Sequence, residues 1–296
     1  MCAFERSEKG MNFNMYIEDD GFSNAYKKMC LYLLKNGEKS CPRNMVTQEI
    51  EGAMIRVKNP RTRMINHEVR NVSISFAIGE WLWHMEGRND LKMIQYYAPS
   101  YYKYSDDGKT LNGAYGPRIK KSLTKIVETL KKDPDSRRAV VPIYGKEDAG
   151  LDSNDIPCTI GFQFLIRNNK LDMIVNMRSN DIFLGFPYDI FNFTMCQEYI
   201  SCKLNIDIGT YTHIANSLHF YEKDREKIIK ASMVEEVKEN EMEKMPKEDL
   251  ETQLSLLYEI EEKIRNKQEY DISKQNDYFS KITKELEKYN NKIRMR

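Results

Sequence analysis

Hydrophobic positions recur at helical spacing in several separate stretches of this chain of 296 residues. Residues 21–36, 72–86 and 119–132 place apolar side chains at intervals of three or four, which predicts amphipathic helices. Residues 189–204 are predicted to form a long buried helix. Between the helices, the pattern predicts strands at residues 50–57, 139–144, 159–167, 171–177 and 207–215.

The composition changes after residue 222, where Glu and Lys become dominant. Apolar residues still recur there at helical spacing, at Leu250, Leu254, Leu257, Ile260 and Ile264. This pattern predicts a solvated helical extension or hairpin, and a heptad-like dimerisation arm is the alternative. We therefore divide the chain into a domain of residues 1–222 and a charged helical extension of residues 223–296, packed on or appended to it. Residues 1–18 are predicted to be irregular.

Charge and cysteine content exclude several classes of protein. The net charge is +1, with 46 basic and 45 acidic residues, so no overall field attracts nucleic acid or a membrane. No apolar run approaches the ~18 residues of a membrane span, and the N-terminus lacks a signal-peptide pattern. The 6 cysteines are scattered without CxxC pairs, which fits a reducing compartment better than a disulfide framework or a zinc site. We expect a cytoplasmic protein without a metal.

Polar side chains crowd one apolar stretch, residues 177–189, which reads Met-Arg-Ser-Asn-Asp-Ile-Phe-Leu-Gly-Phe-Pro-Tyr-Asp. Arg178, Asn180, Asp181 and Asp189 would each need a polar partner among such large apolar neighbours. The stretch is interpreted either as a binding site or as a strand end followed by a Gly-Pro turn.

This stretch resembles the nucleotide-binding signature of the thymidylate synthase superfamily. Other motifs resemble that family in the same order along residues 37–222: Glu80-Trp81-Leu82-Trp83, Tyr115-Gly116, Asp133-Pro134-Asp135-Ser136-Arg137-Arg138, Pro157-Cys158, Gln163-Phe164 and His219-Phe220-Tyr221. The resemblance implies an α+β fold with a large mixed β-sheet flanked by helices. It also implies 5,10-methylenetetrahydrofolate as co-substrate, a pyrimidine nucleoside monophosphate as substrate, and a homodimer.

The resemblance further implies roles for single residues. The catalytic group would be Cys158 as nucleophile, with Glu80, Tyr115 and Asp189. The nucleotide would be bound by Arg43, Arg178, Ser179, Asn180, Gln163, His219 and Tyr221, with Arg137 and Arg138 reaching across from the partner subunit. Folate would contact Trp83, Asp181, Leu184, Gly185 and Tyr188. Arg61 and Arg63 compete with Arg43 for the phosphate, and we expect the surrounding arginines to lower the pKa of the Cys158 thiol.

Asp189 stands where uracil-using members of the family have Asn. An amide complements uracil, which offers an N3–H donor and an O4 acceptor. A carboxylate can instead accept hydrogen bonds from N4–H and a protonated N3 of cytosine, and such charge-assisted bonds are strong. Deoxycytidylate hydroxymethylases carry the same Asp, and the chain resembles them more closely than it resembles the synthases.

The sequence therefore predicts a hydroxymethylase of a cytosine nucleotide, with dCMP favoured over CMP. Cys158 would add to C6, C5 would attack the folate methylene carbon, and water near Glu80 would complete the hydroxymethyl group before Cys158 leaves. Thr159 in place of the synthases' His, and the charged end Lys292-Ile293-Arg294-Met295-Arg296 in place of their apolar tail, favour this over hydride transfer. The alternatives are a CMP hydroxymethylase, a thymidylate synthase acting on dUMP, and an inactive member that binds nucleic acid or protein through its tail.

Overall fold

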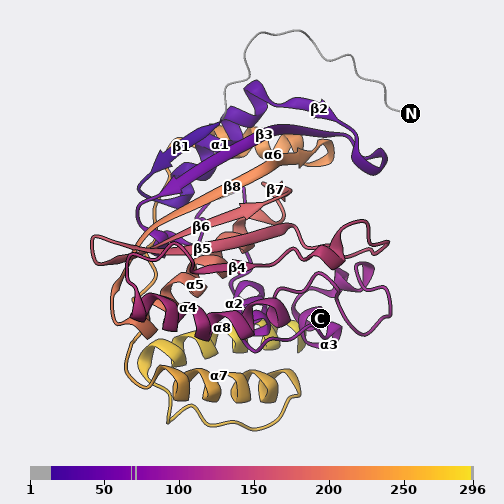
Figure 1. The fold of residues 1–296 in the computed structure, drawn as a ribbon. Helices are drawn as coiled ribbons and strands as arrows, with labels where there is room; N and C mark the ends of the chain where they lie inside the picture. Colours follow the sequence, from indigo (N-terminus) through magenta and orange to yellow (C-terminus); the bar gives the residue numbers. More distant parts are fainter. Residues whose placement is uncertain (1–14, 68, 71, 295–296) are drawn as a thin grey trace.

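The computed structural model describes residues 15–67, 69–70 and 72–294, with side chains as far as Asn291. Its centre is an eight-stranded mixed sheet in the order β1-β3-β8-β6-β5-β4, with β2 paired to β3 and β7 paired to β8 (Figure 1). The strands are β1 (Tyr16–Asp19), β2 (Glu38–Ser40), β3 (Thr47–Val57), β4 (Val140–Pro142), β5 (Thr159–Arg167), β6 (Lys170–Met177), β7 (Asn180–Asp181) and β8 (Asp207–Tyr221). β8 is antiparallel to β3 and parallel to β6, so the predicted mixed sheet is confirmed.

Helices cover one face of this sheet in two layers. The helices are α1 (Phe22–Asn36), α2 (Ile74–Met85), α3 (Leu91–Tyr97), α4 (Gly116–Lys132), α5 (Phe186–Leu204), α6 (Arg225–Met233), α7 (Leu250–Arg265) and α8 (Asp277–Arg294). Short 3-10 turns are η1 (Pro42–Asn44), η2 (Pro60–Thr62), η3 (Pro99–Lys103), η4 (Lys146–Asp148) and η5 (Glu222–Asp224). α5 packs on β6 and β8, α2 and α4 pack on α5, and the α7–α8 hairpin lies outside α2 (Figure 1).

The structure refines two sequence-based predictions about local structure. Residues 182–185 form the predicted turn after β7, but Phe186 and Pro187 already belong to the first turn of α5, where proline is favoured, so this helix begins before the predicted start at Asp189. The N-terminal region is not wholly irregular, because Tyr16–Asp19 forms β1, parallel to β3. The unpaired backbone groups at the edge of β3 provide the hydrogen bonds that this short strand needs. Residues 1–14 lie outside the described part of the chain.

The C-terminal extension is bonded to the rest of the molecule. The apolar stripe of α7 is buried within the chain, so it is not exposed for a dimerisation arm. Tyr97 Oη donates to Glu261 Oε1 at 2.8 Å, and Tyr289 Oη donates to the Tyr96 carbonyl oxygen at 2.9 Å. Ser75 Oγ also donates to the Glu285 carbonyl oxygen at 2.8 Å. The hairpin is therefore held against both α2 and α3.

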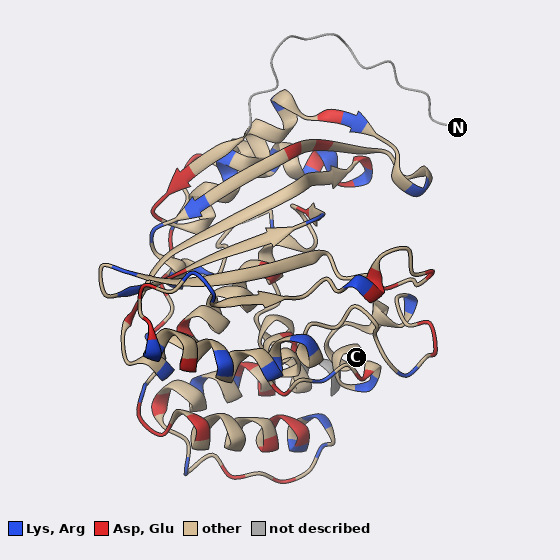
Figure 2. Cartoon of the chain, in the orientation of Figure 1, with Lys and Arg blue, Asp and Glu red and all other residues tan. Residues whose placement is uncertain are grey.

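The opposite face of the sheet is more open to solvent. Met54 is 37% exposed and Val140 is 48% exposed, and Leu165, Ile174 and Ile214 are half-buried on the same side. Charged residues gather mainly on the helices and loops, while β8, β6 and β5 carry few (Figure 2). Within the described residues, no helix is both long and apolar enough to span a membrane.

Candidate active site

Cys158 lies just before β5, next to Arg178 at the end of the adjacent strand β6. The antiparallel pairing of Thr159 with Met177 brings these two residues together. Arg178 donates from Nε to the Pro157 carbonyl oxygen at 2.8 Å, and its Nη2 lies 3.8 Å from Cys158 Sγ. Burial nevertheless raises the pKa of the Cys158 thiol, and the charge of Arg178 offsets this only in part. Arg178 and Arg43 do lower the pKa of this thiol, as expected, but the effect of burial is larger.

Glu80 of α2 accepts hydrogen bonds from two side chains. Tyr101 Oη donates to Glu80 Oε1 at 2.5 Å, and Asn192 Nδ2 donates to Glu80 Oε2 at 2.8 Å. Glu80 is 9% exposed, and burial raises the pKa of its carboxyl group to about 7. This pKa suits a group that gains and loses a proton near neutral pH.

Asp189, in the first turn of α5, lies close enough to Glu80 for their charges to interact. Burial and then the charge of Glu80 raise the pKa of Asp189 to about 8, although Asn180 Nδ2 donates to its Oδ2 at 2.7 Å. The pKa of the Tyr115 hydroxyl is also raised, by burial and by the charges of Asp189 and Cys158. Cys158, Glu80, Tyr115 and Asp189 therefore form one cluster, although they come from different elements.

The raised pKa of Asp189 changes which hydrogen bonds this residue can form with a pyrimidine base. At pH 7 the carboxyl group is mostly protonated, so it offers one donor and one acceptor, as an amide does. A neutral Asp189 does not by itself repel O4 of uracil. The residue type alone therefore discriminates less between cytosine and uracil than the sequence predicted.

The structure separates the three arginines that competed for the phosphate. Arg63 is fully buried and forms an ion pair with Glu198, with 2.7 Å between Nη2 and Oε2. Arg61 forms an ion pair with Glu241. Arg43 is exposed in η1, and its positive charge lowers the pKa of Cys158. Arg43 is therefore the one placed beside the cluster.

His219 and Tyr221 lie at the end of β8, as two residues of one strand face. Their rings are perpendicular, with centroids 5.5 Å apart. Tyr104 lies close enough to Tyr221, Arg43 and Cys158 to interact with all three. This end of β8 therefore extends the cluster towards Arg43.

Asp181 lies beside His219, and one of its two carboxylate oxygens has no hydrogen-bond partner within the described residues. Its Oδ1 accepts hydrogen bonds from the backbone N–H groups of Phe183 at 2.8 Å and Leu184 at 3.0 Å. Its Oδ2 is buried and has no hydrogen-bond partner among the described residues. Burial and the nearby Asp224 raise the pKa of this carboxyl group. An N–H donor of a bound ring would satisfy Oδ2, so the residue fits the predicted folate contact.

The other residues predicted for folate differ in exposure. Trp83 is 2% exposed and donates from Nε1 to the Asp90 carbonyl oxygen at 3.0 Å. Tyr188 Oη accepts a hydrogen bond from the Ser73 backbone N–H at 3.2 Å. Leu184 is 46% exposed. Leu184 therefore lies at the surface, whereas Trp83 is almost fully buried.

Arg137 and Arg138 lie outside the cluster, on an exposed loop before β4. Gln163 Nε2 donates to the Arg137 carbonyl oxygen at 2.8 Å, which holds this loop against the open face of the sheet. Within the described residues, no hydrogen bond joins Gln163 to Cys158. Ser179 is half-buried next to Arg178.

Sequence reasoning missed Asn192, Tyr101 and His213. Asn192 follows Asp189 by three positions on α5, so their shared helix face was a usable signal. Tyr101 is one of five tyrosines in residues 96–104, and no spacing singles it out. His213 is buried in β8 and no sequence signal marked it.

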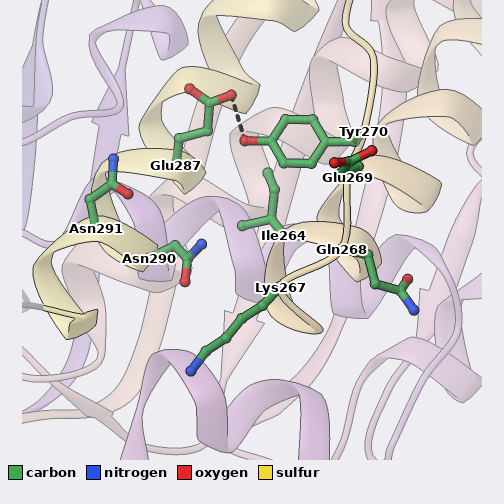
Figure 3. Close-up of a pocket in the computed structure, with 8 residues that line it drawn as sticks. All are labelled: Ile264, Lys267, Gln268, Glu269, Tyr270, Glu287, Asn290 and Asn291. Carbon is green, nitrogen blue, oxygen red and sulfur yellow. Dashed lines mark hydrogen bonds between the residues drawn. The ribbon is translucent and has the colours of Figure 1, made fainter.

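A separate pocket lies at one end of the α7–α8 hairpin (Figure 3). Its volume is about 370 Å³, and Tyr270 Oη donates to Glu287 Oε1 at 2.8 Å within it. No predicted site residue lines it, so it is distinct from the Cys158 cluster. Among the described residues, no group of three His, Cys, Asp or Glu side chains forms a metal site.

Comparison with known proteins agrees with the motifs. The family model described as thymidylate synthase matches residues 24–279. The chain is 32% identical over 217 residues to a deoxyuridylate hydroxymethyltransferase of Bacillus phage SP01, covering 67% of this chain and 57% of that protein. It is 31% identical over 228 residues to the protein of that name from Delftia phage PhiW-14, covering 71% of this chain and 62% of that protein.

A Methanocaldococcus jannaschii protein provisionally named thymidylate synthase is 28% identical over 209 residues, covering 69% of this chain and 90% of that protein. The chain spans less than two thirds of the length of the phage relatives. The family match nevertheless covers most of the chain, and Glu80, Tyr115 and Asp189 of its motifs lie in one cluster with Cys158. The chain belongs to the thymidylate synthase family.

Proposed function

We propose that the protein transfers a one-carbon unit from 5,10-methylenetetrahydrofolate to C5 of dCMP and releases 5-hydroxymethyl-dCMP. The observation that carries this proposal is the cluster in which Asp189 lies with Cys158, Tyr115 and Glu80. It combines a nucleophile, two acids whose pKa values lie near neutrality, and a buried hydroxyl. Such a set can activate the far side of a pyrimidine while protons move at its N3 and C5.

Each residue of the cluster acts in a distinct step of the proposed reaction. The Cys158 thiol gives its proton to water, its sulfur forms a bond to C6, and the electron pair displaced from the C5–C6 double bond passes into the ring. Asp189 gives its proton to N3 and then accepts hydrogen bonds from N3–H and N4–H as a carboxylate. C5 then forms a bond to the methylene carbon of the folate, and Tyr115, with ordered water, assists loss of the C5 proton. The C–N bond to the folate breaks, which releases tetrahydrofolate and leaves an exocyclic methylene on C5. Glu80 holds the water that supplies the new hydroxyl group, after which the Cys158–C6 bond breaks.

Folate supplies the carbon, and Asp181, Leu184, Gly185, Tyr188 and Trp83 would hold it. The unpartnered Oδ2 of Asp181 supports this assignment, because a buried acceptor needs a donor. Its neighbour Leu184 supplies apolar surface at the same place.

The active protein would be a homodimer. Arg137 and Arg138 are exposed on the loop before β4, where they could reach the phosphate bound by a partner subunit. The open face of the sheet, with Met54 and Val140 exposed, supports pairing through that face.

Hydroxymethylation of dUMP is a second candidate, because the phage relatives are named deoxyuridylate hydroxymethyltransferases. A neutral Asp189 is chemically compatible with that base. CMP is a further alternative to dCMP. Ser179 and the paired arginines keep the synthase-like pattern, and we favour the deoxy sugar for that reason.

The test is to incubate the protein with dCMP, CMP or dUMP and 5,10-methylenetetrahydrofolate and to identify products by mass. We expect 5-hydroxymethyl-dCMP without the rise in absorbance that accompanies dihydrofolate. Formation of thymidylate with dihydrofolate, or faster turnover of dUMP, would contradict the proposal. Cys158→Ala is the matched control and should give no product from any nucleotide.

A further inference from the structure

Three buried side chains join Asp189 to the middle of the sheet. Asn180 Nδ2 lies 2.7 Å from Asp189 Oδ2, and Asn180 Oδ1 lies 3.0 Å from His213 Nε2. On the other side of the ring, His213 Nδ1 lies 3.0 Å from Tyr211 Oη. Tyr211 and His213 are fully buried, and Asn180 is 3% exposed. We call Tyr211, His213 and Asn180 the relay.

The elements of the fold hold the relay in place. Tyr211 and His213 are two positions apart on β8, so both project from the same face of the sheet. Phe186 of α5 packs edge-on against the His213 ring, with centroids 5.1 Å apart. A Cβ atom at Gly185 would lie 3.3 Å from Asp189 Oδ2, so the glycine leaves room for the Asn180–Asp189 bond.

One arrangement of hydrogen-bond donors and acceptors is preferred along the relay. Burial lowers the pKa of His213 to about 3, so the ring is neutral and carries one N–H. If that proton is on Nε2, Tyr211 donates to Nδ1, His213 donates to Asn180 Oδ1, and Asn180 donates to Asp189. If it is on Nδ1, the Tyr211 hydroxyl hydrogen has no acceptor, since His213 is its one partner within the described residues. An unpaired buried donor disfavours the second arrangement by on the order of tenfold or more.

We propose that Asn180, oriented by His213 and Tyr211, is a positioning residue that makes Asp189 select a 4-amino over a 4-oxo pyrimidine. Because Asn180 donates to Oδ2, any proton on Asp189 must sit on Oδ1. The two oxygens are then unequal: Oδ1 can donate and Oδ2 can only accept. The inference deepens the proposed function and rests on it.

This inequality distinguishes the two bases. Cytosine presents an acceptor at N3 and a donor at N4, whereas uracil presents a donor at N3 and an acceptor at O4. With Oδ2 opposite position 4, Oδ1–H bonds to cytosine N3 and Oδ2 accepts from N4–H. The same arrangement sets Oδ2 against O4 of uracil, acceptor to acceptor. A carboxyl group without the relay could exchange the two roles and accept either base.

Other ionisable groups lie around Asp189, but they do not change the difference between its two oxygens through hydrogen bonds. Those that interact with its charge, apart from the relay, are Glu80, Asp181, Cys158, Tyr101 and Tyr115. Within the described residues, the Asn180 amide is the one group that forms a hydrogen bond with the Asp189 carboxyl group.

The first experiment determines the tautomer of His213 and needs no activity assay. In protein labelled with ¹⁵N-histidine, long-range ¹H–¹⁵N correlation distinguishes the two neutral tautomers. The chain has 4 histidines, so comparison with His213→Gln assigns the signal. We expect the Nε2–H tautomer at His213 in the wild-type protein. An Nδ1–H tautomer would overturn the relay.

The second experiment measures kcat/KM for dCMP and dUMP from pH 6 to 9. Tyr211→Phe removes one hydroxyl group that touches no substrate, and we expect the dCMP-to-dUMP ratio to fall on the order of tenfold. His213→Gln can still donate an N–H to Asn180 and should keep most of the preference, whereas His213→Phe should lose it. Tyr26→Phe is the matched control, because it removes a buried tyrosine hydroxyl outside the relay and should leave the ratio unchanged.

The outcomes separate the two proposals. An unchanged ratio and pH profile in both Tyr211→Phe and His213→Phe would refute the role of the relay. A wild-type preference for dUMP with the Nε2–H tautomer would refute the stated order of donor and acceptor. If the wild-type protein converts no pyrimidine nucleotide, the proposed function fails, and the tautomer still decides whether the relay exists.

Discussion

Replacing Asp189 with Asn should stabilise the folded protein, and increasingly so as the pH rises. The pKa of Asp189 is raised from its ordinary value of 3.8 to about 8, mainly by burial. The folded chain therefore holds this proton more tightly than the unfolded chain does. The stabilising effect of the proton is complete below about pH 4 and is lost progressively up to about pH 8.

The magnitude follows from the same two values. Each pKa unit corresponds to about 1.4 kcal/mol, so the ceiling is about 6 kcal/mol, of which about 4 kcal/mol is lost between pH 5 and pH 8. Asp189→Asn removes this loss while keeping the shape of the side chain. Its advantage in free energy of unfolding over the wild type should therefore grow by up to about 1.4 kcal/mol per pH unit across that range.

Urea unfolding of both proteins at pH 5, 6, 7 and 8 measures this difference. Asp135→Asn, on an exposed loop, controls for the general effect of removing one negative charge. A stability difference between Asp189→Asn and wild type that does not change with pH would refute the assignment of a buried, protonated carboxyl group. In the activity assay, Asp189→Asn should lose dCMP turnover because an amide cannot give its proton to N3, so the relative preference should move towards dUMP.

Further predictions concern the nucleophile, the second acid and the core. Cys158→Ala should abolish turnover with an unchanged circular dichroism spectrum and melting temperature; near-normal rates would remove the covalent mechanism. Glu80→Gln should lower kcat by about 10²–10⁴-fold and remove the limb of the pH–rate profile near pH 7, and a retained limb would assign it to another group. Arg63→Leu should destabilise the fold by about 3–5 kcal/mol in urea unfolding, since it leaves Glu198 buried without its partner. Arg61→Ala, in a more exposed pair, should cost under about 1 kcal/mol, and equal costs would contradict this reasoning.

Helices and strands were largely predictable where the pattern of hydrophobic positions was long and regular. The helices α1, α2 and α4 and the strands β5 and β6 begin and end within a few residues of the predicted bounds. α5 begins at Phe186 and not at the predicted Asp189, because Pro187, which often marks a turn, fits the first helical turn. β1 was missed because its hydrogen bonds come from β3, far along the chain.

The sequence by itself determined most of the helices and strands, because these depend on local spacing and residue type. The resemblance of its motifs to a family indicated Cys158, Glu80, Tyr115 and Asp189 as one group. Only the tertiary structure decided the charge states and the hydrogen-bond partners in that cluster. Burial makes Asp189 a proton carrier and keeps Cys158 as a thiol, and Glu198 removes Arg63 from the competition for phosphate. Asn180 meets His213 only because β7 and β8 pair in the sheet. Protonation and hydrogen bonding are properties of the space around a group, and residues distant in the chain create that space.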